Sequence, residues 1–274
     1  IIQILHLESD DFPLSVYNDK LVVDIINHMR NVRKAKDGSI NTHMRFLSTI
    51  TKFALSRDYI RKAPKIIKVK QDRQVGETYL PWELELMLVK PEMKKIGFIP
   101  YRNWVLCCFL FSTGARLSSV INIKIRDIDV NRRSIRLSHT KNRQGQVLPI
   151  TPKLLSILNE YLEVRKGGEN DFLFCDYSGN QLTGHAVEQA IEQHNRSRGI
   201  KKHGVHSFRR TFATQAIKLG MSAFELQALL GHSTIEMVSR YVKAVELDLP
   251  ASVTKYNPLE HYEIAREKSI FIKK

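Results

Sequence analysis

One short part of the chain alternates polar and apolar residues with a period of two, whereas the patterns on both sides of it have helical spacing. The alternation occupies residues 134–137 and returns at residues 147–150, beyond a polar turn at 141–145. Two such runs joined by a short turn that contains glycine predict a β-hairpin. A chain with one hairpin among many helical segments is predicted to be mostly α, with a small antiparallel β-sheet.

Apolar spacing and helix-starting residues predict helices along the rest of the chain. The expected segments are residues 21–30, 39 onward, 81–88, 101–111, 152–164, 184–195 and 206–219, followed by two helices that start with capping boxes. Each box pairs a serine, Ser222 or Ser233, with a glutamate three residues later. Ser39 is expected to cap its helix, whose apolar stripe comprises Ile40, Met44, Leu47, Ile50 and Ala54.

The chain carries a large excess of positive charge. Its 274 residues include 43 Lys and Arg against 28 Asp and Glu, which gives a net charge of +15. Such a surplus favours a polyanionic partner, while a hydrophobic fraction of 43% indicates a folded protein. The longest apolar run, 104–111, is too short to cross a membrane. Because the three cysteines form no CxxC pair, we expect a reducing compartment, no structural zinc and a soluble cytoplasmic protein.

Basic residues are concentrated before residue 75, near which the chain is expected to divide. Residues 61–73 hold six basic residues and one acidic residue, and this composition predicts a basic linker. The side of the preceding helix opposite its apolar stripe carries Asn41, Arg45, Ser48 and Lys52. This side is either a solvated face or a surface that contacts DNA phosphates and grooves. The candidate phosphate contacts of the basic stretch are Lys65, Lys68 and Lys70.

Several common enzyme motifs are missing from the sequence, which contains no GK[ST] phosphate loop, HExxH, GxSxG or GxGxxG. What remains in the second half is a set of cationic and imidazole residues followed by a tyrosine, namely Arg116, Lys141, His206, Arg209, His232 and Tyr241. Each has an ordinary structural explanation by itself. His206 and Arg209 share a helix face through their i, i+3 spacing. Cations grouped around a tyrosine hydroxyl are what phosphoryl transfer to a phenol requires.

Three motifs in order resemble those of the tyrosine recombinases, or integrases, of the lambda-integrase type. They are TGARLS at residues 113–118, HSFRRTFAT at 206–214 and LGHS at 230–233, with Tyr241 nine residues after His232. The resemblance covers residues 80–243 well, and the region before it is more loosely similar to the helical core-binding domain of the family. One departure is Ser119, where family members often carry Glu or Asp.

The resemblance implies a role for each residue that matches. Arg116 and Arg209 would bind the scissile phosphate, and Lys141 would protonate the leaving 5′ oxygen. His206 and His232 would donate to the phosphate and help to take the phenolic proton. Tyr241 would be the nucleophile that forms a 3′-phosphotyrosyl bond, which needs neither metal, ATP nor any other cofactor.

The resemblance also implies a domain organisation and a set of partners. The expected parts are a helical, SAM-like core-binding domain at 1–72, a basic linker at 73–79, a mixed α/β catalytic domain at 80–249 and a tail at 250–274 that docks on a neighbouring protomer. The expected partner is double-stranded DNA with inverted-repeat core sites, bound at the nucleoid by a homo-tetramer on two sites, with accessory DNA-bending proteins. No membrane partner is expected.

Three functions fit these residues. The first is site-specific DNA recombination through a Holliday junction, in the integration, excision or resolution of a mobile element. The second is DNA relaxation of the type IB topoisomerase kind, which uses the same transesterification with strand rotation. The third is a DNA-binding regulator that has kept the fold and lost the chemistry. A zinc site at His194, His203 and His206 is disfavoured because no cysteine lies nearby in the sequence.

Overall fold

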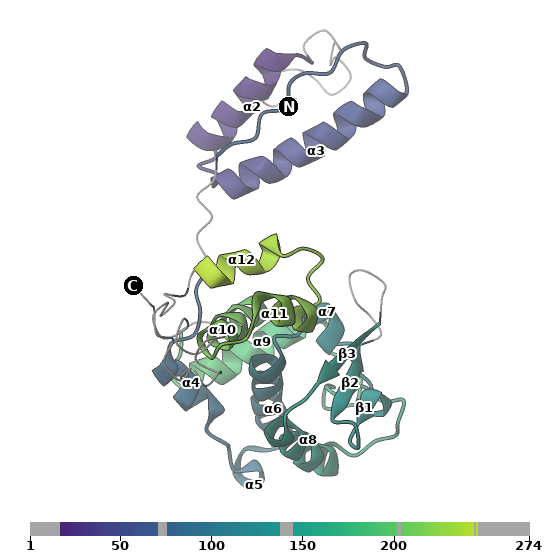
Figure 1. Cartoon of the computed structure of the whole chain (residues 1–274), viewed down its shortest axis with the longest axis vertical. Helices are drawn as coiled ribbons and strands as arrows, with labels where there is room; N and C mark the ends of the chain where they lie inside the picture. The colour runs from purple at the N-terminus through teal and green to yellow at the C-terminus, as the bar shows by residue number, and fades with distance from the viewer. Residues whose placement is uncertain (1–16, 71–75, 138–144, 202–203, 244, 246–274) are drawn as a thin grey trace, which may run out of the picture. The chain divides into compact units, whose positions relative to one another are not determined.

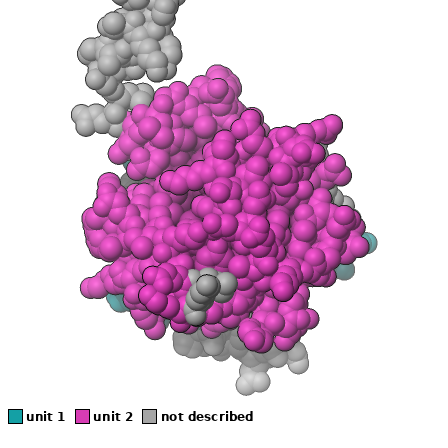
Figure 2. All heavy atoms as spheres, turned by 90° about the horizontal axis from the view of Figure 1, so that it is seen from below, with its two compact units in different colours: residues 1–74 teal, residues 75–274 magenta. Residues whose placement is uncertain are grey.

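The computed structural model describes residues 17–70, 76–137, 145–201, 204–243 and 245. The chain divides into two compact units, residues 1–74 and 75–274, which are coloured separately in Figure 2. Each unit is described by itself below. Among the described residues, no helix is long and apolar enough to span a bilayer.

The described residues form two helices in the first unit and a mixed set of elements in the second (Figure 1). The first unit contains α2 (Asp19–Asn31) and α3 (Asp37–Ser56). The second contains α4 (Pro81–Leu88), α5 (Met93–Ile96), α6 (Phe98–Thr113), α7 (Leu117–Val120), η2 (Ile125–Asp127), β1 (Ile128–Asp129), β2 (Ser134–Leu137), β3 (Gln146–Pro149), α8 (Pro152–Arg165), α9 (Gly184–Arg196), α10 (Val205–Lys218), α11 (Ala223–Leu230) and α12 (Glu236–Lys243). The predicted fold class, mostly α with a small antiparallel sheet, is confirmed.

Helices α2 and α3 share an apolar core in the first unit. The Asn18 side chain caps α2 by accepting a hydrogen bond from the backbone of Leu21. The basic stretch expected to be a linker packs on this core in part, since Ile66 and Val69 lie against it. The backbone N–H of Lys65 also donates to the Asp19 carboxylate. The side chains of Lys65, Lys68 and Lys70 remain exposed.

The structure corrects three expectations for α3. Asn41, placed on the outward side, is buried at 6% exposure and makes two hydrogen bonds of 2.9 Å with the backbone N–H and C=O of Val69. A side-chain amide can both donate to a backbone C=O and accept from a backbone N–H, as a neighbouring strand does. This pairing explains why Asn41 is buried. Ile50 is 58% exposed, whereas Thr51 occupies the buried stripe in its place. Ser39 lies inside the helix, which begins two residues earlier and has no side-chain cap.

Helix α6 is the centre of the second unit. Helices α4, α8, α9 and α10 pack around it, and residues of every turn are buried (Figure 1). Cys107 and Cys108 lie in this core as free thiols, as does Cys175. Because α6 has no solvent-facing stripe, its end at Gly114 is fixed inside the unit, next to α7.

A three-stranded antiparallel sheet in the order β1-β2-β3 lies beside the helices. The predicted hairpin forms its second and third strands, in a register that pairs the buried residues Ile135 and Leu148. The two-residue strand β1 was not predicted, because it is too short to show alternation. Residues 138–144, between β2 and Gly145, lie outside the described residues.

Helices α10, α11 and α12 share a second apolar cluster of this unit, which includes Tyr241. The capping box at Ser222 is confirmed, with the serine and Glu225 bonded reciprocally. The box expected at Ser233 is wrong, because α12 begins only at Glu236 and the Ser233 hydroxyl contacts the sulfur of Met237 at 3.9 Å.

The first residues of the second unit are attached to α10. The backbone N–H of Tyr79 donates to the Thr211 hydroxyl at 2.9 Å. A methyl group added to Gly76 would lie 2.3 Å from Nη1 of Arg210, so this guanidinium rests against the glycine backbone.

Candidate active site

Five of the six predicted catalytic residues line one hollow of about 720 Å³ in the second unit. Four elements bring them together: Arg116 precedes α7, His206 and Arg209 lie on α10, His232 follows α11, and Tyr241 lies on α12. None of the described residues that line the hollow is acidic. A hollow with several cations and no carboxylate attracts anions such as phosphate esters.

The two arginines are held by the C-terminal ends of two helices. Both α6 and α11 end at a left-handed glycine, Gly114 or Gly231, with φ of +59° in each case. Nη2 of Arg116 donates to the Gly231 carbonyl at 2.9 Å. Nη1 of Arg209 donates to the Gly114 carbonyl at 2.8 Å. The negative ends of the two helix dipoles therefore stabilise the guanidinium charges that the hollow presents.

Arg209 is the more deeply placed of the two arginines, at 7% exposure. Its Nη2 donates to the Leu230 carbonyl at 2.7 Å. Burial, together with the charge of Arg116, lowers the pKa of Arg209 to about 10. This pKa still leaves the guanidinium charged at neutral pH, so both Arg116 and Arg209 bring a positive charge to the hollow.

His232 is neutral at neutral pH. Burial, followed by the charges of Arg209 and Arg116, lowers the pKa of His232 to about 4. Its Nε2 lies 2.7 Å from Nη2 of Arg209. Because a guanidinium can only donate, Nε2 is the acceptor and Nδ1 carries the proton. Nδ1 is buried and has no hydrogen-bond partner among the described residues.

Tyr241 is buried at 5% exposure in the middle of this cationic group. Its ring is nearly parallel to the His232 imidazole, with an interplanar angle of 10° and 6.5 Å between centroids. Tyr241 and the two arginines line the same hollow, and the phenol raises the pKa of Arg116 and Arg209 electrostatically, although burial outweighs this effect. The arrangement brings a potential oxygen nucleophile to an anion-binding site.

Lys141 lies outside the described residues, but the strand after its turn is described. Gln146, the first residue of β3, donates from its side-chain amide to the carbonyls of Ala228 and Leu229, at 3.3 and 2.8 Å. The sheet is thereby fixed to the end of α11, next to Gly231. Sequence reasoning missed Gln146, whose neighbours in the sequence carry no motif.

The remaining predicted residues lie elsewhere. Ser119 is buried in α7 and does not line the hollow. Arg45 and Lys52 are exposed and Ser48 is half-buried on α3 in the first unit. His194, part of the disfavoured zinc set, is buried and its Nε2 lies 3.0 Å from the Met87 carbonyl. Two arginines that sequence reasoning did not select, Arg210 and Arg240, line the hollow.

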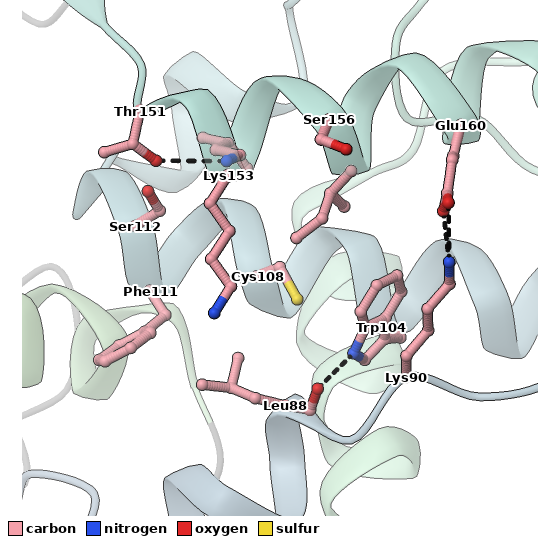
Figure 3. Close-up of a pocket in the computed structure, with 12 residues that line it drawn as sticks. Leu88, Lys90, Trp104, Cys108, Phe111, Ser112, Thr151, Lys153, Ser156 and Glu160 are labelled. Carbon is pink, nitrogen blue, oxygen red and sulfur yellow. Dashed lines mark hydrogen bonds and ion pairs between the residues drawn. The ribbon is translucent and has the colours of Figure 1, made fainter.

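A second hollow, of about 480 Å³, lies between α4, α6 and α8 and contains none of the predicted catalytic residues (Figure 3). Its walls are mainly apolar, and an ion pair between Lys90 and Glu160 lies at its edge (Figure 3). Cys108 faces it (Figure 3), and burial raises the pKa of that thiol to about 12, so the thiol is not a nucleophile at neutral pH.

Comparison with known proteins agrees with this geometry. Residues 85–246 match the family model described as the phage integrase family. The chain is 24% identical over 264 residues to the tyrosine recombinase XerD of Staphylococcus aureus, an alignment that covers 92% of this chain and 86% of that protein. It is 25% identical over 267 residues to XerD of Staphylococcus saprophyticus, over 89% of this chain and 90% of the relative.

Solved structures with the same fold include two recombinases bound to DNA. The Tn1549 transposon integrase with transposon right end DNA has a TM-score of 0.74 at 19% identity, covering 94% of this chain and 90% of that one. The XerH recombinase in a post-cleavage complex with palindromic difH has a TM-score of 0.73 at 20% identity, over 90% and 74% of the two chains. The fold is therefore that of the tyrosine recombinases. The chain belongs to the phage integrase family of these enzymes, and membership supports site-specific recombinase activity.

Proposed function

We propose that this protein cuts and rejoins DNA strands at specific sites through a covalent bond between Tyr241 and a 3′ phosphate. The observation that carries the proposal is the gathering of Arg116, His206, Arg209, His232 and Tyr241 on one hollow whose described lining residues include no acidic residue. A phosphodiester bound there meets two guanidinium groups and a phenol together.

The proposed reaction is a transesterification, in which one phosphate ester bond forms as another breaks. The phenolic oxygen of Tyr241 attacks the phosphorus, and the bond from phosphorus to the 5′ oxygen breaks. Arg116 and Arg209 bind the non-bridging oxygens and stabilise the charge that builds up in the transition state. Lys141 supplies a proton to the leaving 5′ oxygen, and the phenolic proton passes to the histidines.

His232 has to change partner for this role. In this structure its Nε2 accepts a hydrogen bond from Arg209. When a phosphate oxygen takes that donor, Nε2 becomes available to accept the phenolic proton, and the imidazolium that results is stabilised by the bound phosphate. His206 is exposed at the edge of the same hollow and donates to the phosphate.

The covalent ester conserves the energy of the cut strand, so a 5′ hydroxyl from another duplex can displace Tyr241 without ATP or metal. Two successive strand exchanges pass through a Holliday junction, which suits the integration, excision or resolution of a mobile element. Support for a DNA substrate comes from the charge of +15 and from the DNA in the complexes of the Tn1549 integrase and XerH. The first unit would hold the core site through Arg45, Ser48, Lys52, Lys65, Lys68 and Lys70.

The assembly that performs exchange would be a homo-tetramer on two sites with inverted repeats, joined by accessory DNA-bending proteins. In this proposal residues 250–274 dock on a neighbouring protomer. Their support is compositional: Leu259, Tyr262, Ile264, Ile270 and Ile272 are more apolar than a free terminus usually is.

The test uses a duplex selected for binding from a random pool and then nicked to trap the cut product. The wild type should form a covalent protein–DNA adduct, whereas Tyr241→Phe should bind with unchanged affinity and form none, because only the phenolic oxygen is lost. Tyr177→Phe, which alters an exposed tyrosine away from the hollow, is the matched control. An adduct in the Tyr241→Phe protein would refute the assignment. Relaxation of supercoils without strand exchange would favour the topoisomerase alternative.

A further inference from the structure

Arg240 is a charged residue of the hollow that the proposed reaction leaves unused. It immediately precedes Tyr241 on α12 and lines the same hollow. Its side chain is exposed, in contrast to the buried Arg209. Arg240 therefore adds an exposed guanidinium to the hollow, beside the two that are held by helix ends and that of Arg210, which rests against Gly76.

The contacts of Arg240 fix one part of the side chain and leave the other part open. Its Nε donates to the Met237 carbonyl of the preceding turn at 2.8 Å. Its guanidinium carbon lies 5.6 Å from the centre of the Tyr241 ring, within the range of a cation–π contact. No described residue forms a hydrogen bond or an ion pair with its Nη atoms. The outer edge of the guanidinium is thus available to a ligand while its inner face contacts the nucleophile.

The positive charges around Arg240 favour a ligand that carries several negative charges. The charge of Arg240 acts on Arg209 and on His232, in each case in the direction that disfavours a further proton. The four guanidinium groups of Arg116, Arg209, Arg210 and Arg240, with no carboxylate among the described lining residues, repel one another. One phosphate charge compensates the two arginines at the base of the hollow only in part. A strand of DNA brings further phosphates along the same backbone, which a small anion does not.

We propose that Arg240 binds the phosphate next to the scissile phosphate on the cleaved strand, and that it acts as a positioning residue for Tyr241. This inference depends on the proposed function. The Nη atoms would take the flanking phosphate, while the ring contact and the Met237 hydrogen bond join that phosphate to α12. Binding the correct stretch of backbone would thereby hold the phenol in place for attack.

The experiment compares Arg240→Gln, Arg240→Lys and the control Lys243→Gln, which removes an exposed charge from the same helix outside the hollow. Affinity for the selected duplex is measured against salt concentration, and adduct formation is measured at saturating duplex. Arg240→Gln should reduce the slope of log K against log[salt] by about 0.9 and slow adduct formation about tenfold. Arg240→Lys should keep the slope but recover only part of the rate, because the planar contact with the ring is lost.

An unchanged salt slope in Arg240→Gln would overturn the phosphate contact, and an unchanged adduct rate would overturn the positioning role. If Lys243→Gln changed the salt slope and the adduct rate as much as Arg240→Gln does, the effects would come from the loss of any positive charge on α12. That result would also overturn the proposal. Far-UV circular dichroism and thermal unfolding check that each variant is folded. If the wild type binds the duplex but forms no adduct, the proposed function fails, while the salt slopes still test the phosphate contact.

Discussion

At the scale of single residues, the site depends on two glycines as well as on the arginines that they help to hold. The carbonyls of Gly114 and Gly231 are acceptors for Arg209 and Arg116, and both glycines have positive φ. A β-carbon on Gly231 would lie 2.9 Å from the side-chain oxygen of Gln146 and 3.5 Å from Nη1 of Arg116. A substitution there would therefore press on the Gln146 side chain, and the backbone strain would fall on the carbonyl that accepts from Arg116.

Gly231→Ala should cost about 1–2 kcal/mol of unfolding free energy, because an L-residue is strained in the left-handed region. The matched control is Gly199→Ala, since Gly199 has φ of +72° and open space around the added carbon. Both variants should lose stability in urea unfolding, but only Gly231→Ala should also slow adduct formation. Equal adduct rates in the two variants would show that the Gly231 contacts do not matter to the reaction.

The residues that could be predicted from the sequence are those whose motif positions are fixed by the reaction. Arg116, His206, Arg209, His232 and Tyr241 are brought together on one hollow. Their protonation states and acceptors could not be predicted, because burial and helix-end carbonyls are properties of the folded chain. The outward position predicted for Asn41 is wrong, because helical spacing alone cannot reveal that a polar side chain will bind the backbone of a distant segment.

At the scale of elements, long apolar periods predict helices that the structure contains, whereas short or irregular elements leave no pattern in the sequence. The bounds of α4 follow from Pro81 at its start, and α8 begins at Pro152 for the same reason. Strand β1 has only two residues and gives no pattern. The Ser233 box has the right residue types, but the chain turns through residues 232–235 to bring His232 to the hollow, so the helix begins later.

The extended segment at residues 65–70 combines inward apolar residues with outward lysines. We expect the lysines to neutralise DNA phosphates, so that replacing Lys65, Lys68 and Lys70 together by Gln flattens the dependence of binding on salt. Each lost contact should remove about 0.9 from the slope. Replacing Lys20, Lys34 and Lys36 removes the same charge from the same unit and serves as the control. A slope that equals the wild-type value in the first triple variant would place the segment off the DNA.

At the scale of the whole molecule, the second unit has a mainly apolar hollow that contains none of the predicted catalytic residues (Figure 3). Deleting residues 259–274 should leave binding to a single site unchanged, because the predicted DNA contacts lie in other parts of the chain. It should abolish the four-protomer complex and strand exchange. Gel-shift and crosslinking measurements on two-site DNA check this result. A truncated protein that still assembles as a tetramer would show that the tail packs on its own protomer.

The hydrogen bond between Tyr79 and Thr211 has a mechanical consequence for the second unit. Tyr79 lies just after the connection between the two units, and Thr211 lies two residues from Arg209 on α10. The hydrogen bond therefore fixes Tyr79 to the helix that carries Arg209 and His206. The guanidinium of Arg210 against Gly76 adds a second point of attachment on that helix. The first described residues of the second unit are thus fixed at two points to α10, so a shift of residues 76–79 would be passed on to the helix that carries Arg209 and His206.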